Sequence, residues 1–243
     1  MKTAVAVPLA AAVLSTLVNA QTPPPVPAST TPVAVIVKVP KPWYAPRAVV
    51  VGKMRDTIPQ YESLPGLSYK MFSFARADGH FGGLYLWQDR AAAEAWFNPA
   101  WFERVRRERG AEGQVRIFEA PVVLVNPGTN AGSGEGDALA TLVTIPTPPG
   151  VTRERLVAEF RAALPVYEKI AGLKRKYFII TGDGRFGGIY QWANQAAADA
   201  WFNPGWHERV KKTYGASAAI EWFDTPILLP SKLADNRIDT ARP

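Results

Sequence analysis

Two lysines stand where a charged side chain is costly. Lys176 shares strand parity with Phe178 and Ile180, and Lys70 stands in the same way beside Phe72. An amine on a buried face needs a partner or takes a lowered pKa, so it could act as a base or hold an acidic or phenolic ligand. The alternative is a lysine at a strand edge whose aliphatic stem lets the ammonium reach water. The residues leave both interpretations open.

Aromatic side chains alternate along the segment that follows each lysine. Tyr85 and Trp87 share one face of an expected strand, as do Tyr190 and Trp192, while Gln191 takes the opposite face. Such aromatics either fill a core between a sheet and its helices or line an apolar pocket with a few polar groups. We retain all five residues as candidates for ligand binding.

The chain contains only two histidines, at non-equivalent positions of an internal repeat. His80 aligns with Arg185, and His207 aligns with Phe102. Acid–base chemistry at an imidazole would therefore be confined to one copy. His80 falls on an expected exposed hairpin, so His207, beside Trp206 on an expected helix, is the better catalytic candidate, together with the lysine of the same copy. Arg185 is kept as a ligand-binding candidate.

An Asn-Pro pair follows the alanine-rich segment in both copies. Asn203 stands close to Trp201, and both are candidates for ligand binding. The simpler account of Asn203 is structural. Asparagine caps a helix well, and the proline after it has no amide hydrogen that needs an acceptor in the first turn.

All these residues belong to a sequence that occurs twice. Segment 78–87 returns as segment 183–192, and segment 96–105 returns as segment 201–210, both at an offset of 105 residues. Two copies, each about a domain long, indicate a duplicated domain and not a solenoid.

Each copy predicts the same order of elements. β-Branched runs that end in proline predict strands at 33–39 and 139–145. Apolar residues at i, i+4 and i+8 predict helices over 47–61 and 153–167. The other expected elements are strands at 67–74 and 173–180, strands at 82–87 and 187–192, helices at 91–97 and 196–202 with a further helical turn after each, and strands at 115–125 and 220–229. The order β-α-β-β-α-β predicts an α+β fold of two ferredoxin-like repeats.

Several motifs resemble those of the YdhR-like monooxygenases, which belong to the dimeric α+β barrel superfamily. They are Pro65-Gly66-Leu67 with Lys70, 82–87 and 91–97 in the first copy, and Gly172-Leu173, Lys176, 187–190 and 196–202 in the second. The resemblance implies two ferredoxin-like units that close into a barrel with helices outside. Because a linker joins the units, we expect an intramolecular pseudo-dimer in which each copy covers the other's open sheet face. Further oligomerisation stays open.

The resemblance also implies chemistry on a small molecule. In the resembled monooxygenases the substrate supplies the carbanion, and the protein supplies a base and a dry apolar pocket without a cofactor. Haem-degrading members of the superfamily use a helix-borne histidine with asparagine and tryptophan. His207, Asn203 and Trp201 could imitate that set, so haem is a minor alternative.

Other chemistries lack their sequence signals. The chain has no cysteine, and no His/Asp/Glu spacing typical of a metal site. A glycine-rich phosphate loop and a serine nucleophile elbow are also missing. We therefore expect no metal and no cofactor. The expected function is oxidation of a small aromatic or polyketide-like substrate, or binding of small hydrophobic molecules without catalysis.

Residues 1–20 have the pattern of a secretory signal peptide, with a lysine, an apolar run and a small-residue cleavage site. We therefore expect a secreted or periplasmic protein with no stable membrane insertion after cleavage. The formal net charge of +7 would suit nucleic acid, but export argues against that partner. The expected organisation is a signal peptide at 1–20, a Pro-rich tether at 21–32, repeat 1 at 33–125, a Gly/Ser linker at 126–138, repeat 2 at 139–230 and a tail at 231–243.

Overall fold

The computed structural model describes residues 31–41, 44–128, 138–233 and 238–239. The expected signal peptide, nearly all of the tether and most of the linker lie outside the described residues. Repeat 1 consists of β1 (Val33–Val39), α1 (Arg47–Asp56), α2 (Ile58–Glu62), β2 (Leu67–Ala75), β3 (Phe81–Trp87), α3 (Arg90–Trp96), α4 (Pro99–Arg109) and β4 (Gln114–Val125). Repeat 2 consists of β5 (Leu139–Pro146), α5 (Arg153–Tyr167), β6 (Leu173–Ile180), β7 (Arg185–Trp192), α6 (Gln195–Trp201), α7 (Pro204–Tyr214) and β8 (Ala219–Leu228).

The predicted α+β fold of two ferredoxin-like repeats is confirmed. Within repeat 1 the strands are ordered β4-β1-β3-β2, and within repeat 2 they are ordered β8-β5-β7-β6. The last strand of each repeat also pairs with the other repeat, β8 with β2 and β4 with β6. The two sheets therefore join edge to edge into one closed barrel, in which the outer strands of each sheet are paired with those of the other.

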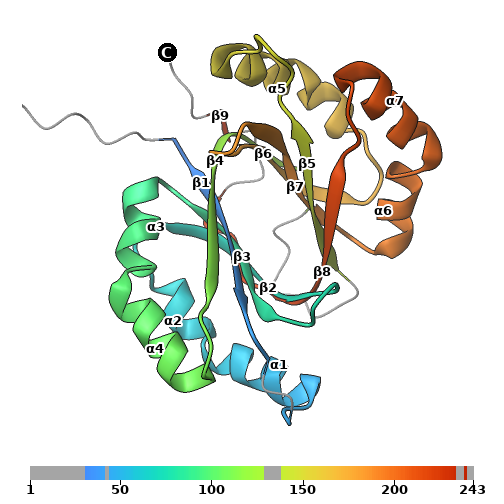
Figure 1. Ribbon diagram of the computed structural model, residues 1–243. Helices are drawn as coiled ribbons and strands as arrows, with labels where there is room; N and C mark the ends of the chain where they lie inside the picture. Colours follow the sequence, from blue (N-terminus) through green and yellow to red (C-terminus); the bar gives the residue numbers. More distant parts are fainter. Residues whose placement is uncertain (1–30, 42–43, 129–137, 234–237, 240–243) are drawn as a thin grey trace, which may run out of the picture.

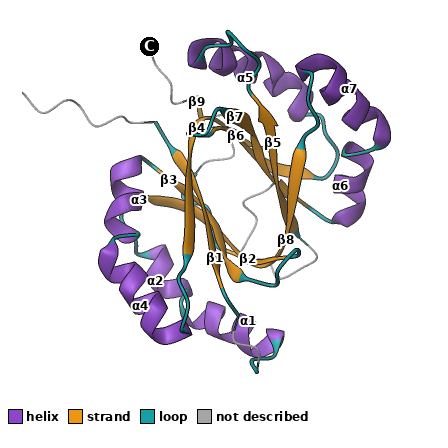
Figure 2. Ribbon diagram, in the orientation of Figure 1, coloured by secondary structure: helices purple, strands orange, loops and turns teal. Residues whose placement is uncertain are grey.

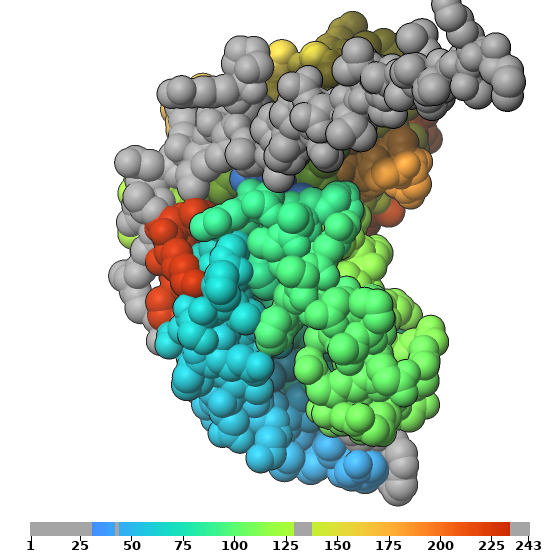
Figure 3. Space-filling model, turned by 90° about the vertical axis from the view of Figure 1, so that its left-hand side faces the viewer, coloured from blue at the N-terminus to red at the C-terminus, as the bar shows by residue number. Residues whose placement is uncertain are grey.

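Helices cover the outside of this barrel on two opposite sides (Figures 1 and 2). The helices of repeat 1 lie over one side and those of repeat 2 over the other. Figure 3 shows the outer side of repeat 1, where α2 lies beside α3 and α4. None of the helices in the described ranges is long and apolar enough to cross a membrane.

The alternation seen in the sequence separates two kinds of core. Leu84 and Leu86 of β3 lie in the barrel interior, together with residues of both repeats. Tyr85 and Trp87 point the other way, into the layer between the sheet and the helices of repeat 1. Tyr190 and Trp192 occupy the equivalent layer of repeat 2.

The structure departs from the expected elements in three main ways. The helix expected over 47–61 breaks at Thr57 into α1 and α2. Pro59 cannot donate a backbone hydrogen bond into the preceding turn, and Oγ1 of Thr57 donates to the carbonyl of Met54 at 2.7 Å, whereas α5 continues through Pro165. The helical turns expected after 91–97 and 196–202 are full helices of 11 residues each, α4 and α7. Part of the expected tail is ordered as β9 (Ile238–Asp239), which pairs with β4.

Candidate functional site

A cavity of about 300 Å³ lies between the sheet and the helices of repeat 2. Apolar and aromatic side chains make up most of its wall, and charged groups of α5 and α7 complete it. It is lined by Val143, Ile145, Glu159, Phe160, Ala163, Tyr167, Lys176, Phe178, Phe186, Gly187, Tyr190, Trp201, Trp206, Arg209, Val210, Thr213 and Tyr214. Both its size and its apolar wall are typical of a small-molecule site.

Lys176 contributes a buried amine to this cavity, and only 2% of the residue is exposed. Its Nζ lies 3.1 Å from the ring centroid of Tyr167, 3.9 Å from that of Phe178 and 4.6 Å from that of Tyr190. Burial lowers the pKa of Lys176 well below the ordinary lysine value. The ring faces act in the opposite direction, because they attract the ammonium form.

The same arrangement occurs in repeat 1. Nζ of Lys70 lies 3.0 Å from the ring centroid of Tyr61, 3.8 Å from that of Phe72 and 4.7 Å from that of Tyr85. Lys70 is also 2% exposed, and burial lowers its pKa in the same way. Neither lysine therefore reaches solvent along a strand edge, which was the structural alternative.

Polar groups beside Lys176 can hydrogen-bond a ligand. The hydroxyl of Tyr190 interacts with that of Tyr167, and burial, followed by this interaction, raises the pKa of Tyr190 well above its usual value. The indole Nε1 of Trp201 is buried and has no acceptor among the described residues. A buried N–H without a partner is uncommon, so this group is available to an acceptor atom of a ligand.

The Gly-Gly pair of β7 makes room for the lysine. Lys176 is opposite Tyr190 in the register of β6 and β7. A Cβ atom at Gly188 would lie 2.9 Å from Cε of Lys176 and 3.0 Å from the Tyr190 ring. The absence of a side chain at Gly188 therefore lets the lysine stem cross β7 toward the helices.

Three of the candidates from sequence meet at this cavity: Lys176, Tyr190 and Trp201. Sequence reasoning missed Tyr167, whose ring lies nearest the amine. A signal for it was present, because Tyr61 and Tyr167 end the aligned helical segments of the two copies.

Gln191 and the tryptophans of β3 and β7 do not line the cavity. Gln191 lies in the barrel interior, where its Oε1 accepts a hydrogen bond of 3.2 Å from the hydroxyl of Tyr69. Trp192 is fully buried and donates through Nε1 to Oγ1 of Thr141 at 3.1 Å. Trp87 is buried in the core of repeat 1. Packing, the alternative for the aromatic pairs, therefore accounts for both tryptophans.

The remaining candidates lie outside the cavity wall. Asn203 caps α7: its Oδ1 accepts from the amide of Trp206 at 3.0 Å and its Nδ2 donates to the carbonyl of Ala200 at 2.8 Å. His207 is exposed on α7. Arg185 donates to the backbone and side chain of Thr144, at 3.1 Å in each case.

The residues that the haem alternative would use are not brought together around one cavity. His207 would have to face a cavity with Trp201, but the imidazole is on the exposed side of α7 and packs edge-on against Trp206. Both polar atoms of the Asn203 side chain are already engaged in the cap. As a separate point, no group of three or more His, Asp or Glu side chains that could hold a free metal ion is found among the described residues.

No protein-family model matches the chain, and no curated protein sequence matches it. Solved structures do resemble it. A candidate monooxygenase from Lactobacillus acidophilus is 14% identical with a TM-score of 0.58, and the match covers 86% of this chain and 98% of that one. A candidate monooxygenase from Fusobacterium nucleatum is 10% identical with a TM-score of 0.59, over 84% and 95% of the two chains. An anthrone oxidase-like protein is 10% identical with a TM-score of 0.53, over 88% and 97%.

These matches extend over both repeats, because each repeat alone makes up less than half of the chain. At such low identity they bear on the fold, and there the resemblance inferred from the motifs is confirmed. The chain has the α+β barrel fold of monooxygenase-like proteins, with both ferredoxin-like units in one polypeptide.

Proposed function

We propose that the chain is an exported monooxygenase-like protein that oxidises a small aromatic or polyketide-like molecule without a cofactor. The observation that carries the proposal is the buried amine of Lys176, which lines an apolar cavity together with Tyr190 and Trp201. The cavity volume of about 300 Å³ is at the lower end of the range for small-molecule sites, which favours a small substrate.

Lys176 would act as the general base. Because burial lowers its pKa, a larger part of the amine is neutral than in water, and a neutral amine accepts a proton. The proton would come from an activated C–H group or a phenol of the substrate. The N–H of Trp201 would donate to the oxygen on which the negative charge develops.

Oxidation then balances without a further reductant. The substrate anion transfers one electron to O₂, and the resulting radical and superoxide combine to a peroxide. The proton held by Lys176 passes to the peroxide, and loss of water leaves a ketone. A CH₂ group and O₂ are thus converted to C=O and H₂O, and the four electrons that the substrate loses are those that O₂ gains.

Anthrone is the first substrate to test, because one protein with this fold is described as anthrone oxidase-like. We expect one O₂ to be consumed for each anthraquinone formed. Lys176→Met should lower kcat/KM by about 10²–10⁴-fold, which is typical for the loss of a general base. Lys212→Met, on the exposed side of α7, is the control and should have the wild-type rate. Failure of the wild-type protein to accelerate O₂ uptake with anthrone or a hydroquinone would refute the oxygenase.

A second function, binding of a small hydrophobic molecule without catalysis, is favoured by one contact. The Lys176 amine lies 3.1 Å from the centroid of the Tyr167 ring, a position that stabilises an ammonium. An ammonium attracts an acidic or phenolic ligand but cannot take its proton. Saturable binding of anthrone or a phenol, weakened in Lys176→Met and without O₂ uptake, would support this function over the oxygenase.

Export is supported by the pattern of residues 1–20 alone. Intact-mass measurement on the protein recovered from the periplasm or medium of an expressing bacterium tests it. The mature chain should begin near Gln21, and a full-length chain confined to the cytosol would contradict export.

A further inference from the structure

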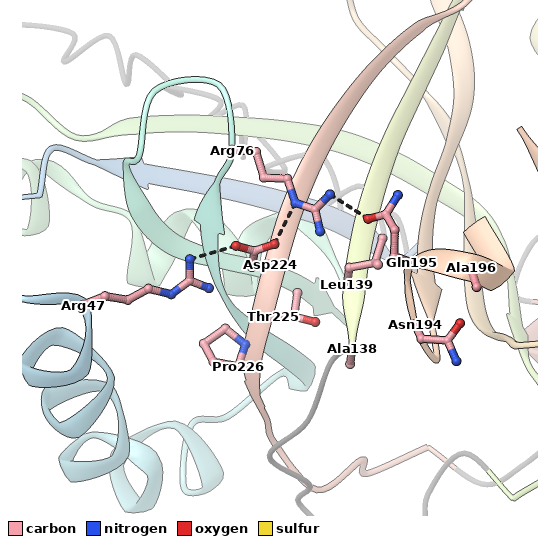
Figure 4. Close-up of a pocket in the computed structure, with 10 residues that line it drawn as sticks. All are labelled: Arg47, Arg76, Ala138, Leu139, Asn194, Gln195, Ala196, Asp224, Thr225 and Pro226. Atoms are coloured by element: carbon pink, nitrogen blue, oxygen red, sulfur yellow. Dashed lines mark hydrogen bonds and ion pairs between the residues drawn. The ribbon is translucent and has the colours of Figure 1, made fainter. Parts of the chain in front are cut away.

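A second cavity, of about 490 Å³, lies where repeat 1 meets repeat 2 through the pairing of β2 with β8. None of its lining residues lines the Lys176 cavity. Four polar side chains come to it from different elements: Arg47 begins α1, Arg76 follows β2, Asp224 lies on β8 and Gln195 begins α6 (Figure 4). Ala138, Leu139, Asn194, Ala196, Thr225 and Pro226 complete the wall. We call this the inter-repeat cleft.

The charges in the inter-repeat cleft do not cancel. Asp224 accepts from Nη1 of Arg47 at 2.8 Å and from Nε of Arg76 at 2.7 Å. Nη1 of Arg76 also donates to Oε1 of Gln195 at 2.7 Å. Burial alone would raise the pKa of Asp224, but the hydrogen bonds from Arg47 and Arg76 outweigh it and lower the pKa. One carboxylate therefore faces two guanidinium groups, and the cleft keeps a positive charge.

Hydrogen-bond donors remain in the cleft after these contacts are made. Thr225 is 1% exposed, its backbone N–H donates to the carbonyl of Ala138, and its Oγ1 has no partner among the described residues. Oδ1 of Asn194 accepts from the amide of Ala197, which leaves the NH₂ group of Asn194 for another acceptor. A buried hydroxyl without a partner costs stability, unless a ligand satisfies it.

In the part of the chain that the structure describes, the opposite junction has different side chains at these positions. There β4 pairs with β6, and Arg153 bonds to Glu119 at 2.8 Å in the position equivalent to Arg47 and Asp224. In the aligned sequence Gly182, Arg90 and Ala120 take the places of Arg76, Gln195 and Thr225. The barrel closes on that side with the Arg153–Glu119 pair, so the second guanidinium beside the carboxylate and the buried hydroxyl are particular to the inter-repeat cleft.

We propose that the inter-repeat cleft binds a small organic anion through a carboxylate or phosphate group. Unused guanidinium N–H groups of Arg47 and Arg76 would hold the anionic oxygens, since the planar fork of arginine matches both groups. The hydroxyl of Thr225 would donate to the same group. Leu139, Ala196 and Pro226 would contact the apolar part of the molecule. The site is independent of the oxygenase proposal, because it uses none of the groups around Lys176.

Isothermal titration calorimetry of the whole protein with benzoate, phenyl phosphate and inorganic phosphate tests the site. We expect saturable binding of benzoate or phenyl phosphate that weakens as salt is added, because screening reduces the attraction between charges. The preferred probe identifies the anionic group. Binding of inorganic phosphate as tight as that of phenyl phosphate would refute the contact with the apolar part of the ligand.

Three variants separate binding from barrel stability. Arg76→Gln should weaken the preferred probe at least about tenfold, as expected for the loss of a charged hydrogen bond. Thr225→Val should weaken it about threefold or more while the protein stays folded, as loss of one neutral hydrogen bond predicts. Arg153→Gln removes the equivalent ion pair at the other junction and should leave the affinity within about twofold. The proposal is overturned if neither organic probe binds the wild-type protein, or if Arg76→Gln and Arg153→Gln have the same effect.

Discussion

The amine of Lys176 is subject to two opposing influences, burial, which favours the neutral form, and three ring faces, which favour the ammonium. Which form prevails decides between a base and a ligand-binding cation. The balance can be measured without knowing the substrate, because a shifted pKa makes stability depend on pH.

Stability should rise with pH on account of Lys176. In the unfolded chain its pKa returns to about 10.4. Between the lowered folded-state value and that pH, the unfolded chain holds a proton that the folded chain lacks, so raising the pH favours folding. Lys176→Met lacks this contribution. The unfolding free energy of the variant, relative to that of wild type, should therefore be highest at low pH and should fall as the pH rises. Urea unfolding between about pH 5 and pH 9.5 measures this difference in unfolding free energy. The range stays below the pH at which the raised pKa of Tyr190 makes stability fall as the pH rises.

The control for this experiment is the exposed Lys212→Met, whose unfolding free energy should follow that of wild type at every pH. A constant difference between Lys176→Met and wild type across the whole range would mean that the amine titrates alike in the folded and unfolded chains.

Gly188 determines the path of the lysine stem. In Gly188→Ala the new Cβ would lie 2.9 Å from Cε of Lys176, so either the lysine or β7 must move. We expect a loss of about 1–3 kcal/mol in unfolding free energy, as for other overpacked sites, and weaker binding of phenolic ligands. Gly182→Ala is the matched control, because nothing lies within 4 Å of a Cβ there. Equal stability and equal affinity of the two variants would contradict this role.

At the scale of elements, the Asn-Pro pairs serve helix starts. Asn98 and Asn203 cap α4 and α7 through the same two hydrogen bonds, one to a backbone N–H and one to a carbonyl. The repetition of this geometry in both copies favours a structural role over a catalytic one.

A substitution series at Asn203 separates the two roles. Asn203→Ala should lower the unfolding free energy by about 1 kcal/mol, whereas Asn203→Asp keeps an acceptor at the N-cap and should cost much less. Both variants should have the kcat/KM of wild type with anthrone when they are assayed folded. A variant of normal stability with a large loss of turnover would restore the asparagine as a functional residue.

At the scale of the whole molecule, each repeat depends on the other to cover its sheet. The barrel interior is shared: Ile36 and Leu84 come from repeat 1, and Leu142 and Ile189 from repeat 2. Cutting the chain within the linker should therefore leave either half associated or aggregated, because each would expose an apolar sheet face and the edges of two strands. Size-exclusion chromatography with light scattering on residues 31–128 alone checks this, and a stable, soluble monomer would contradict it.

The two halves are not interchangeable. Tyr69 and Arg175 occupy equivalent positions of the two copies and meet inside the barrel, where the guanidinium carbon of Arg175 lies 4.0 Å from the centroid of the Tyr69 ring. A pair of repeat 2 units would bring two arginines together instead. Repulsion between the two like charges in a buried site would disfavour such a pair. When both halves are present together, they should form a complex of one repeat 1 unit and one repeat 2 unit. Mass spectrometry of the intact complex can determine this composition.

The sequence alone determined the order of elements, the duplication and the two faces of each strand. These are local properties, set by spacings of two and of three to four residues and by turn residues such as Asp-Gly. The same information made Lys176 a candidate buried amine, with a lysine at a strand edge as the alternative, and predicted the barrel through the motifs it resembles. It erred by a few residues at Thr57, because both copies carry a proline near this point and only the helix of the first copy breaks there.

Only the tertiary structure decided which candidates share a cavity. It brought Tyr167 and Trp201 to Lys176 and left Gln191 inside the barrel, because strand parity assigns a face but does not say what lies over it. It also joined Arg47 and Arg76 to Asp224 across 177 and 148 residues of chain. Such contacts depend on the pairing of β2 with β8. That pairing is specified by how the two repeats close on each other, and no local periodicity encodes it.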